Sequence, residues 1–556
     1  MTSRRGFIGL VLVGFTLSLL LFSGCRQSNP EVSVPLPEVD ATVLGGQRLT
    51  LLAKPGPWRD ITGLIGYGDR LWFANSVAFE NHNSADLYSY ALATGETRYE
   101  QHLFSQSVGK PLLSGGLLYW PFEDPRFSAD LGEYMVTDGT EWQWHILPTG
   151  EAFHLHTMAE WQRALVAGTG AWAGRIQQSD DQGQTWQVVY EHPTPPRQVS
   201  RITELASLGD QLYIGVTALQ EDGIKLLRGD PPEFVAGWPK GKRVSDLVTF
   251  KGWLYGVNLN LDDSAAVWRT QATQTEQVTE LDGFRIRSIA ADDDNLWAVN
   301  ADSTGGFLWH SQDGLNWTAA HRFEQMQPLE VTVYGGQVYV GATDGDGVGV
   351  LLGPEQAGTA VTAAEPAPLR PQPSVSLPLA AALADLDQTA KAGETYTEGN
   401  AQDAIVKALL PLARMHTPAA GDALTQRLMQ PLPRSTAKLF EGRAEAPATD
   451  VWQFYLLWAI GLNGYGQVPL ALVTRSWDRP ENPREKYWHP APAALWTTAR
   501  LGQDDPDTIA ALIARLRFDD DPLWLRGDVV GALTTLTGQQ WGYDQAAWEQ
   551  WWQAVD

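Results

Sequence analysis

A turn followed by an apolar and aromatic strand recurs along the first two thirds of the chain. The copies begin with Leu71, Leu118, Leu165, Leu212, Leu254, Leu296 and Val338 as the leading apolar residue of the strand. The spacing between these residues is 47 three times and then 42 three times. Such regularity predicts one supersecondary unit that is repeated along the chain.

A period in the forties, built of short strands and glycine-rich turns, is typical of a β-propeller blade. Each blade is a four-stranded antiparallel sheet that buries its faces by radial stacking. The copies therefore predict an all-β seven-bladed propeller over residues 46–353. The last copy is one strand short. The alternating segment 47–53 has no partner of its own, so we expect it to close the ring as the missing outer strand.

Two turns between expected third and fourth strands carry the same motif, at Ser179, Asp181, Gly183 and Trp186 and at Ser311, Asp313, Gly314 and Trp317. The aspartate is expected to accept turn amides, and the glycine to supply an unusual backbone angle. The tryptophan is expected to fill the gap between sheets. The motif resembles the Asp-box, or BNR repeat, of sialidases and other propellers, including a photosystem II assembly factor. The resemblance implies a structural role for these residues.

The pattern changes after a Pro- and Ala-rich stretch at 354–378, which we interpret as a semi-rigid linker. Helical spacing then predicts an all-α domain over 379–556, with helices at 404–414, 451–462, 506–517, 523–536 and 544–555. Asp505 before Pro506 is a good helix N-cap. The last fifty or so residues resemble the ending of bacterial HEAT-repeat proteins. That resemblance implies a HEAT-like domain with a groove for a protein partner.

The N-terminus has the pattern of an export signal. Arg4 and Arg5 precede an apolar run at 7–22, which is short for a membrane-spanning helix. The run ends at Cys25, the only cysteine of the chain, and 21–25 resembles the lipobox of bacterial lipoproteins. The resemblance implies a signal peptide at 1–24, lipidation of Cys25 and a flexible tether at 25–45. Both Sec and twin-arginine export remain open. We expect a lipid-anchored protein on the extracytoplasmic side of a bacterial membrane, periplasmic or at the cell surface.

Composition narrows the set of partners. The chain of 556 residues has 40 Lys+Arg against 65 Asp+Glu, a formal net charge of −25. Such a surface repels phosphate backbones, so no nucleic-acid partner is expected. A single cysteine excludes an intrachain disulfide and a cysteine-based zinc site. We predict no cofactor and no metal, and we interpret the Asp-rich segments 292–295 and 344–347 as turns, with calcium binding at these loops as the open alternative.

One register of the repeat carries candidate chemistry. Eleven residues before the leading apolar residue lie, in chain order, Asp60, Ser107, His154, Arg201, Arg243, Arg285 and Gln327. This register begins the innermost strand, where a propeller channel opens. We therefore expect Arg201, Arg243 and Arg285, with His154 beside them, to bind a carboxylate, sulfate or phosphate. The alternative is that the arginines decorate the rim or pair with acids such as Glu204, Asp246 or Asp302.

These observations favour a lipid-anchored binding or scaffold protein. Its propeller and helical domain would engage a protein partner, an anionic small molecule or a glycan, and it would touch the membrane through the lipid only. No catalytic residue is predicted, and enzymatic activity stays open. One alternative is a sialidase-like glycoside hydrolase or lyase acting on acidic glycans, although the chain lacks the Arg-Ile-Pro of sialidases. Another is an assembly factor for a membrane complex.

Overall fold

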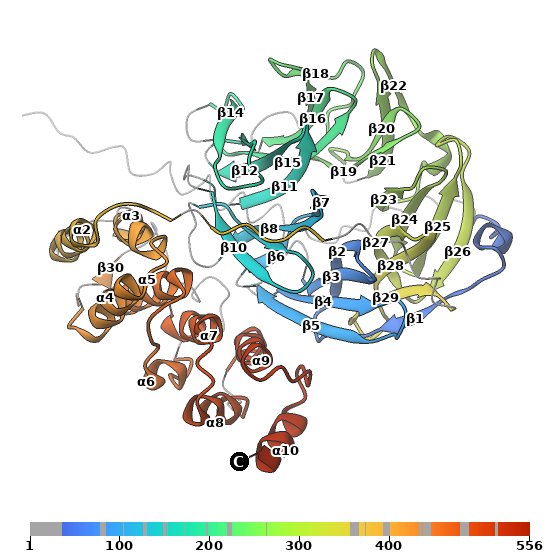
Figure 1. The fold of residues 1–556 in the computed structure, drawn as a ribbon. Helices are drawn as coiled ribbons and strands as arrows, with labels where there is room; N and C mark the ends of the chain where they lie inside the picture. The colour runs from blue at the N-terminus through green and yellow to red at the C-terminus, as the bar shows by residue number, and fades with distance from the viewer. Residues whose placement is uncertain are drawn as a thin grey trace, which may run out of the picture.

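The computed structural model has a propeller-like β domain followed by a separate helical region (Figure 1). It describes residues 36–77, 85–103, 105–125, 131–147, 152, 154–171, 173–195, 198–218, 225–262, 264–355, 366–372, 374–392, 401–432, 436–437, 446–478, 489–517 and 521–555. The predicted signal peptide and Cys25 lie outside the described residues. Across those ranges, no helix has both the length and the apolar character needed to cross a bilayer.

The β domain contains four sheets of four strands and one sheet of five strands, each a separate blade. The first blade has β2 (Asp60–Tyr67), β3 (Arg70–Ser76), β4 (Ala85–Ala91) and β5 (Thr97–Leu103). The five-stranded blade has β6 (Ser105–Val108), β7 (Leu112–Ser114), β8 (Leu117–Pro125), β9 (Glu133–Thr137) and β10 (Trp142–Ile146).

Three further blades follow later in the chain. One has β19 (Arg243–Phe250), β20 (Trp253–Leu259), β21 (Ala265–Gln271) and β22 (Gln274–Gln277). The next has β23 (Ile286–Ala291), β24 (Leu296–Asp302), β25 (Gly305–Ser311) and β26 (Thr318–Glu324). The last has β27 (Gln327–Tyr334), β28 (Gln337–Thr343), β29 (Gly349–Pro354) and β1 (Leu49–Ala53).

The remaining strands form one continuous sheet of eight. It contains β11 (His154–Trp161), β12 (Ala164–Ala171), β13 (Arg175–Ser179), β14 (Gln187–Glu191), β15 (Ser200–Leu208), β16 (Gln211–Ala218), β17 (Lys225–Arg228) and β18 (Glu233–Phe234). The prediction of seven separate blades is therefore wrong, because the described residues form five separate blades. The third and fourth repeats merge where β12 pairs with β15 at Gly170 and Arg201. Gly170 permits this pairing, since a β-carbon there would lie 2.6 Å from Arg201 Cγ.

The predicted closure of the β domain is confirmed. Strand β1 pairs antiparallel with β29, with Thr50 opposite Gly353. The chain before β1 also contacts the sheets, because Val39 bridges Ala319 of β26 and the Asp40 amide donates to the Ala319 carbonyl at 2.9 Å. A short 3₁₀ helix, η1 (Ala41–Leu44), follows with Asp40 as its N-cap. The part of the predicted tether after residue 38 thus packs on the propeller.

The turn between β13 and β14 has the hydrogen bonds expected of its sequence. Asp181 accepts bonds from the Thr185 amide at 2.8 Å and the Thr185 hydroxyl at 2.6 Å. Gly183 has φ +89°, and its amide donates to Ser179 Oγ. Trp186 is buried and donates to the Tyr134 hydroxyl of the neighbouring blade. The turn therefore fastens one blade to the next.

A second 3₁₀ helix of the β domain is η2 (Thr279–Leu281). The helical region contains α2 (Leu379–Ala392), α3 (Ala401–Ala413), α4 (Pro418–Met429), α5 (Ala448–Asn463), α6 (Leu470–Val473), α7 (Pro490–Leu501), α8 (Pro506–Arg515), α9 (Leu523–Thr537) and α10 (Gln545–Val555), with a bridge between β30 (Thr436–Ala437) and β31 (Ala446–Pro447). Helices α3, α5, α7 and α9 pack in succession, and α4, α6, α8 and α10 lie against this row or one another. The expected N-cap is confirmed, because Asp505 accepts from the Thr508 amide at 3.0 Å.

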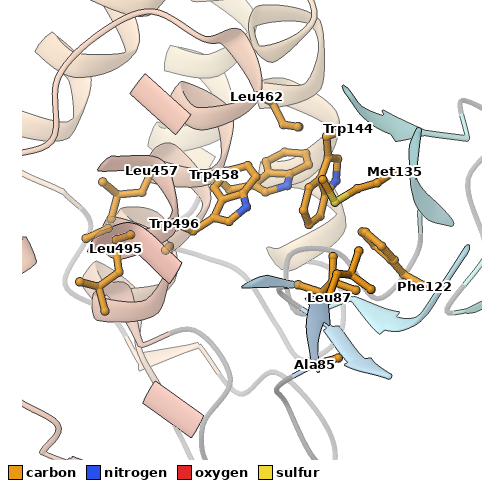
Figure 2. Close-up of a cluster of buried hydrophobic side chains, with 14 of the residues drawn as sticks. Ala85, Leu87, Phe122, Met135, Trp144, Leu457, Trp458, Leu462, Leu495 and Trp496 are labelled. Atoms are coloured by element: carbon orange, nitrogen blue, oxygen red, sulfur yellow. The ribbon is translucent and has the colours of Figure 1, made fainter. Parts of the chain in front are cut away.

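The helical region packs directly on the first two blades, and one apolar core extends through both (Figure 2). At its centre Trp144 of β10 meets Trp496 of α7 edge to face, with ring centroids 5.3 Å apart. Linker residues after 365 also lie on the β domain, where the Ala367 amide donates to the Gly116 carbonyl and Leu369 joins the apolar cluster. A shared apolar core of this kind opposes relative motion of the two parts.

A buried polar network crosses the same contact. His102 of β5 lies between two aspartates, with Nδ1 2.7 Å from Asp86 and Nε2 2.8 Å from Asp528 of α9. Asp86 also accepts from the hydroxyl of Tyr543 at 2.6 Å. The Gln540 side chain bonds the Tyr99 backbone in both directions. We call His102, Asp86, Asp528 and Tyr543 the interdomain network.

Gly531 allows helix α9 to approach β5 closely enough to form this network. A β-carbon at Gly531 would lie 2.5 Å from the His102 β-carbon, which forces the elements apart. Alanine in place of a helical glycine ordinarily stabilises by about 1 kcal/mol. We expect Gly531→Ala instead to lower the free energy of unfolding by about 1 to 3 kcal/mol, as overpacking does. Urea unfolding followed by tryptophan fluorescence measures this, and a more stable variant would contradict the packing described.

Candidate functional site

The innermost strands of the repeats surround a common axis. Strand β2 contacts β27, followed round the ring by β23, β19, β15 and β11. Side chains from distant repeats meet at this axis, since Lys110 Nζ, before β7, lies 3.5 Å from Asp246 Oδ1 of β19. The axis is the channel of the propeller-like domain, and the predicted arginine register lies at its end.

A β-bulge at the same place in the innermost strands decides which side chains face the channel. The register shifts between Leu155 and Thr157 of β11, and between Ile286 and Ser288 of β23. Residues ten and seven before the leading apolar residue are buried in the blades, as Ile286 and Ile289 show. Residues eleven, nine and eight before it therefore face away from the blade core, because side chains alternate until the bulge adds a residue.

The first part of the site gathers residues of β11, β15 and β19. The rings of His154 and His156 stack with centroids 4.7 Å apart. Burial, followed by the neighbouring His154, Arg201 and Arg243, lowers the pKa of His156 well below its ordinary value. The His156 side chain is 9 % exposed. Both His156 and Arg201 pack on Gly170, where a β-carbon would lie 2.9 Å from His156 Nε2. Neutral imidazole and charged guanidinium groups thus share one small space.

The second part of the site lies in the following repeat. Arg285 is exposed and stands just before β23, and Arg287 occupies the bulge of that strand. Burial and the positive charge of Arg285 lower the pKa of Arg287 to about 10, although Asp60 acts in the opposite direction. We call His154, His156, Arg201, Arg243, Arg285 and Arg287 the basic mouth.

Three side-chain nitrogens of the basic mouth, from Arg201, Arg287 and His156, are buried with no partner in the described part of the chain. Among the described residues, Arg201 Nε, Arg287 Nε and His156 Nε2 have no hydrogen-bond partner. Buried polar groups in folded proteins nearly always have one, so such atoms require an explanation. A carboxylate, sulfate or phosphate would supply acceptors to the guanidinium groups, with charge of the matching sign.

At the same axis Lys110 lies beside Asp246 and is also influenced by the charges of Glu204 and Glu330. Burial tends to lower the pKa of Lys110, but Asp246, Glu204 and Glu330 raise it. Burial and Asp246 raise the pKa of Glu204 to about 7 and that of Glu330 to about 8. The lysine therefore stays charged, and two of the carboxyls carry only part of their charge near neutral pH.

Three residues of the predicted site lie together. His154 stacks on His156 and Arg201 packs beside it, and the charge of Arg243 also acts on His156, whereas that of Arg285 acts on Arg287. Of the acids considered as alternative partners, Glu204 lies close enough to Arg243 for the charge of the arginine to act against the rise in the pKa of Glu204. Asp302 is engaged within its own turn, by the amides of Thr304 and Gly305.

The sequence analysis did not single out His156, Arg287 or Lys110. His156 and Arg287 stand two residues after the predicted register, and Lys110 three residues after it. Comparison of the repeats at these two further positions would have found them. The signal was present, but its meaning depends on the bulge, which the period alone does not indicate.

The Asp-rich segments form turns, as predicted. Asp344 accepts from the amides of Asp346 and Val348 and from Lys54, and Asp292 accepts from the amides of Asp294 and Asn295. In the described part of the chain, no group of three or more His, Cys, Asp or Glu side chains is arranged to hold a metal ion.

No protein-family model matches the chain, and no curated protein matches it. Among solved structures, it is similar to the β-propeller domain of the trilobed protease from Pyrococcus furiosus, with 9% identity over 55% of this chain and 99% of that chain, at a TM-score of 0.40. Polysaccharide lyase Uly1 matches with 11% identity over 55% of this chain and 91% of its own, at 0.37. The calcium-binding protein regucalcin from Agrobacterium tumefaciens matches with 13% identity over 46% and 93%, at 0.34. At these TM-scores the matches carry no functional argument.

Proposed function

We propose that this chain is a binding protein that holds an anionic ligand at the basic mouth of its propeller-like domain. The observation that carries the proposal is the packing of Arg201 and His156 together against Gly170, with Arg201 Nε buried and unpartnered among the described residues. Desolvated guanidinium nitrogens are costly unless an acceptor reaches them. An anion with several oxygen atoms supplies such acceptors, and paired forks of donors favour a planar or tetrahedral oxyanion.

The charge of the whole protein makes this site selective. The chain has a formal net charge of −25, so anions are repelled from most of its surface. At the basic mouth, four arginines outnumber the nearby acids Asp60, Glu123 and Glu204. A local excess of positive charge in a concave site concentrates anions where the surrounding surface does not.

We expect Arg201→Met to weaken binding of sulfate by about 10-fold or more, because one charge-assisted hydrogen bond contributes about 1.5 to 3 kcal/mol. Isothermal titration calorimetry on the full chain measures the change. Arg163→Met is the matched control, since Arg163 is an exposed arginine of the same eight-stranded sheet, at the other end of β11 from His154. Equal sulfate affinity of Arg201→Met and the control, or no sulfate binding by the unmodified protein, would overturn the proposal.

The same proposal includes a lipid anchor at Cys25, an extracytoplasmic location and a scaffold role for the helical region. The anchor, and with it the location, rests on the lipobox resemblance. The HEAT-like character of the helices is supported by the successive packing of α3, α5, α7 and α9. The Asp-box character of the two turns is supported by the hydrogen bonds of Asp181 and Asp313 with their own turn amides.

A protein partner for the helical region is favoured by exposed apolar side chains. Met429 is 67% exposed and Tyr465 45% exposed, both on the part of the helical region formed by α4 to α6. Exposed large apolar side chains are common in contact surfaces between proteins. The opposite end of the region is occupied, since α7 and α9 pack on the first two blades.

We favour a binding function for the basic mouth over a catalytic one. A sialidase-like hydrolase would need a tyrosine and a carboxylate beside the arginines. Within the described residues, no tyrosine hydroxyl bonds to Arg201 or Arg285. The carboxylate of Glu123 lies near a histidine of the site, with its Oε1 3.9 Å from His156 Nδ1. The assembly-factor alternative is supported by the turn motif only.

A further inference from the structure

We infer that the ligand of the basic mouth carries two anionic groups, one held by Arg201 and Arg243 and the other by Arg285 and Arg287. The inference rests on the proposed function and narrows its ligand class. It predicts a compound such as a dicarboxylate, or another small molecule with two carboxylate, sulfate or phosphate groups. Nothing in the sequence patterns alone separates one anionic group from two.

The first argument is that the basic mouth has two distinct groups of charge. His156 stacks on His154 and packs together with Arg201 against Gly170, on β11, β12 and β15. Arg287 stands in the bulge of β23, which follows β15 and β19 round the ring. The two groups therefore occupy different strands of the ring. A single carboxylate held by Arg201 and Arg243 therefore leaves Arg285 and Arg287 with Asp60 as their acid, which balances only one of their two positive charges.

The second argument is that both groups contain a buried donor with nothing to bind. Arg201 Nε and Arg287 Nε are each buried without a hydrogen-bond partner in the part of the chain that the structure describes. The two atoms stand on different strands, β15 and β23. Because each guanidinium forms a planar fork of donors, each can hold an oxyanion of its own.

The third argument concerns Asp60, the acid that faces Arg287. The Asp60 carboxylate accepts hydrogen bonds from Nε and Nη2 of Arg59, each at 3.0 Å. It also accepts one from the Thr343 hydroxyl at 3.2 Å. Its two oxygens are therefore engaged by neighbours other than Arg287. Even with the charge of Asp60 counted, Arg285 and Arg287 together retain one positive charge, and Arg59 adds another.

The experiment compares glutarate with its monomethyl ester, which keeps the carbon chain and removes one charge. Titration calorimetry of the full chain should show glutarate binding about 10-fold or more tighter than the ester, as one additional charge-assisted contact provides. In Arg287→Met this ratio should fall close to one. Arg287→Lys should keep part of it, because charge remains while the fork is lost. Arg163→Met should keep the full ratio, and thermal unfolding of each variant checks that it is folded.

The possible outcomes separate the two proposals. Equal affinity of the unmodified protein for glutarate and its ester would overturn the second anionic subsite while the single-anion site stands. An unchanged ratio in Arg287→Met would also overturn it. Absence of binding for both compounds and for sulfate would overturn the proposed function together with this inference. If glutarate binds more tightly than its ester, the affinities of diacids from malonate to adipate would measure the distance between the two groups of arginines.

Discussion

Replacement of His102 by alanine should lower the free energy of unfolding by about 3 to 5 kcal/mol, the usual cost of breaking a buried ion pair. His102 is 8 % exposed and bonds Asp86 on one side and Asp528 on the other. Its loss leaves two buried carboxylates, Asp86 of β4 and Asp528 of α9, at the contact between the first blade and the helical region. Asp86 keeps the hydroxyl of Tyr543 as a donor, but no positive charge of the interdomain network remains.

Urea unfolding of the full chain, followed by tryptophan fluorescence, measures this loss. His321→Ala is a suitable control, because His321 is a half-buried histidine of β26 that takes part in no ion pair with a described residue. The control should cost about 1 kcal/mol or less, as substitutions away from such features do. A similar cost for both variants would show that the interdomain network does not hold the two parts together.

The second large effect is a dependence of stability on pH. Burial tends to lower the pKa of His102, but the charges of Asp528 and Asp86, with their hydrogen bonds, raise it to about 9. An unfolded histidine titrates near 6.5. A raised pKa in the folded state means that the stabilisation is complete below pH 6.5 and is lost as pH rises through 9. At 1.36 kcal/mol for each pH unit, the loss is about 3 kcal/mol.

Other groups change stability in the same pH range, so the prediction concerns the difference in the free energy of unfolding between the unmodified protein and His102→Ala. Burial raises the pKa of Glu133 to about 8, and Glu204 and Glu330 are raised as well, so each also loses stabilisation as pH rises. The tyrosines around His102, Tyr99 and Tyr543, have pKa values well above the ordinary one and stay protonated. Unfolding of the unmodified protein and of His102→Ala at pH 6 and pH 10 isolates the histidine. We expect the gap between them to shrink by about 3 kcal/mol, and a constant gap would contradict a raised pKa.

Much of the fold could be predicted because it repeats. The expected helix 523–536, for example, is observed as Leu523–Thr537. Periodic burial fixes such elements, and the spacing of the leading apolar residues fixes their number. The division into separate blades was not predictable from the spacing. It depends on how closely two backbones approach, as at Gly170 and Arg201.

The docking of the helical region had no periodic signal. Its apolar part uses Trp144 and Trp496, which are ordinary core residues of their own elements, and its polar part uses Asp86, His102 and Asp528. These residues come together only through the path of the whole chain. The interface also means that removal of the helical region would uncover an apolar surface on the first two blades.

The position of the arginines along the innermost strands could be predicted, but the second row of side chains that faces the channel could not. The repeat comparison places Arg201 and Arg243 in one register, and the structure shows both beside His156. The bulge then brings a second row of side chains to the channel, which includes Arg287 and Lys110. A bulge is a property of strand pairing, so a single sequence does not reveal it.

The most direct test of the central claim is a crystal structure of the full chain with selenate, whose selenium is located by its anomalous signal. The account predicts selenate at the basic mouth, within hydrogen-bond distance of Arg201 and Arg243. An empty basic mouth at selenate concentrations that saturate binding in solution, or selenate bound only at exposed surface lysines, would contradict it.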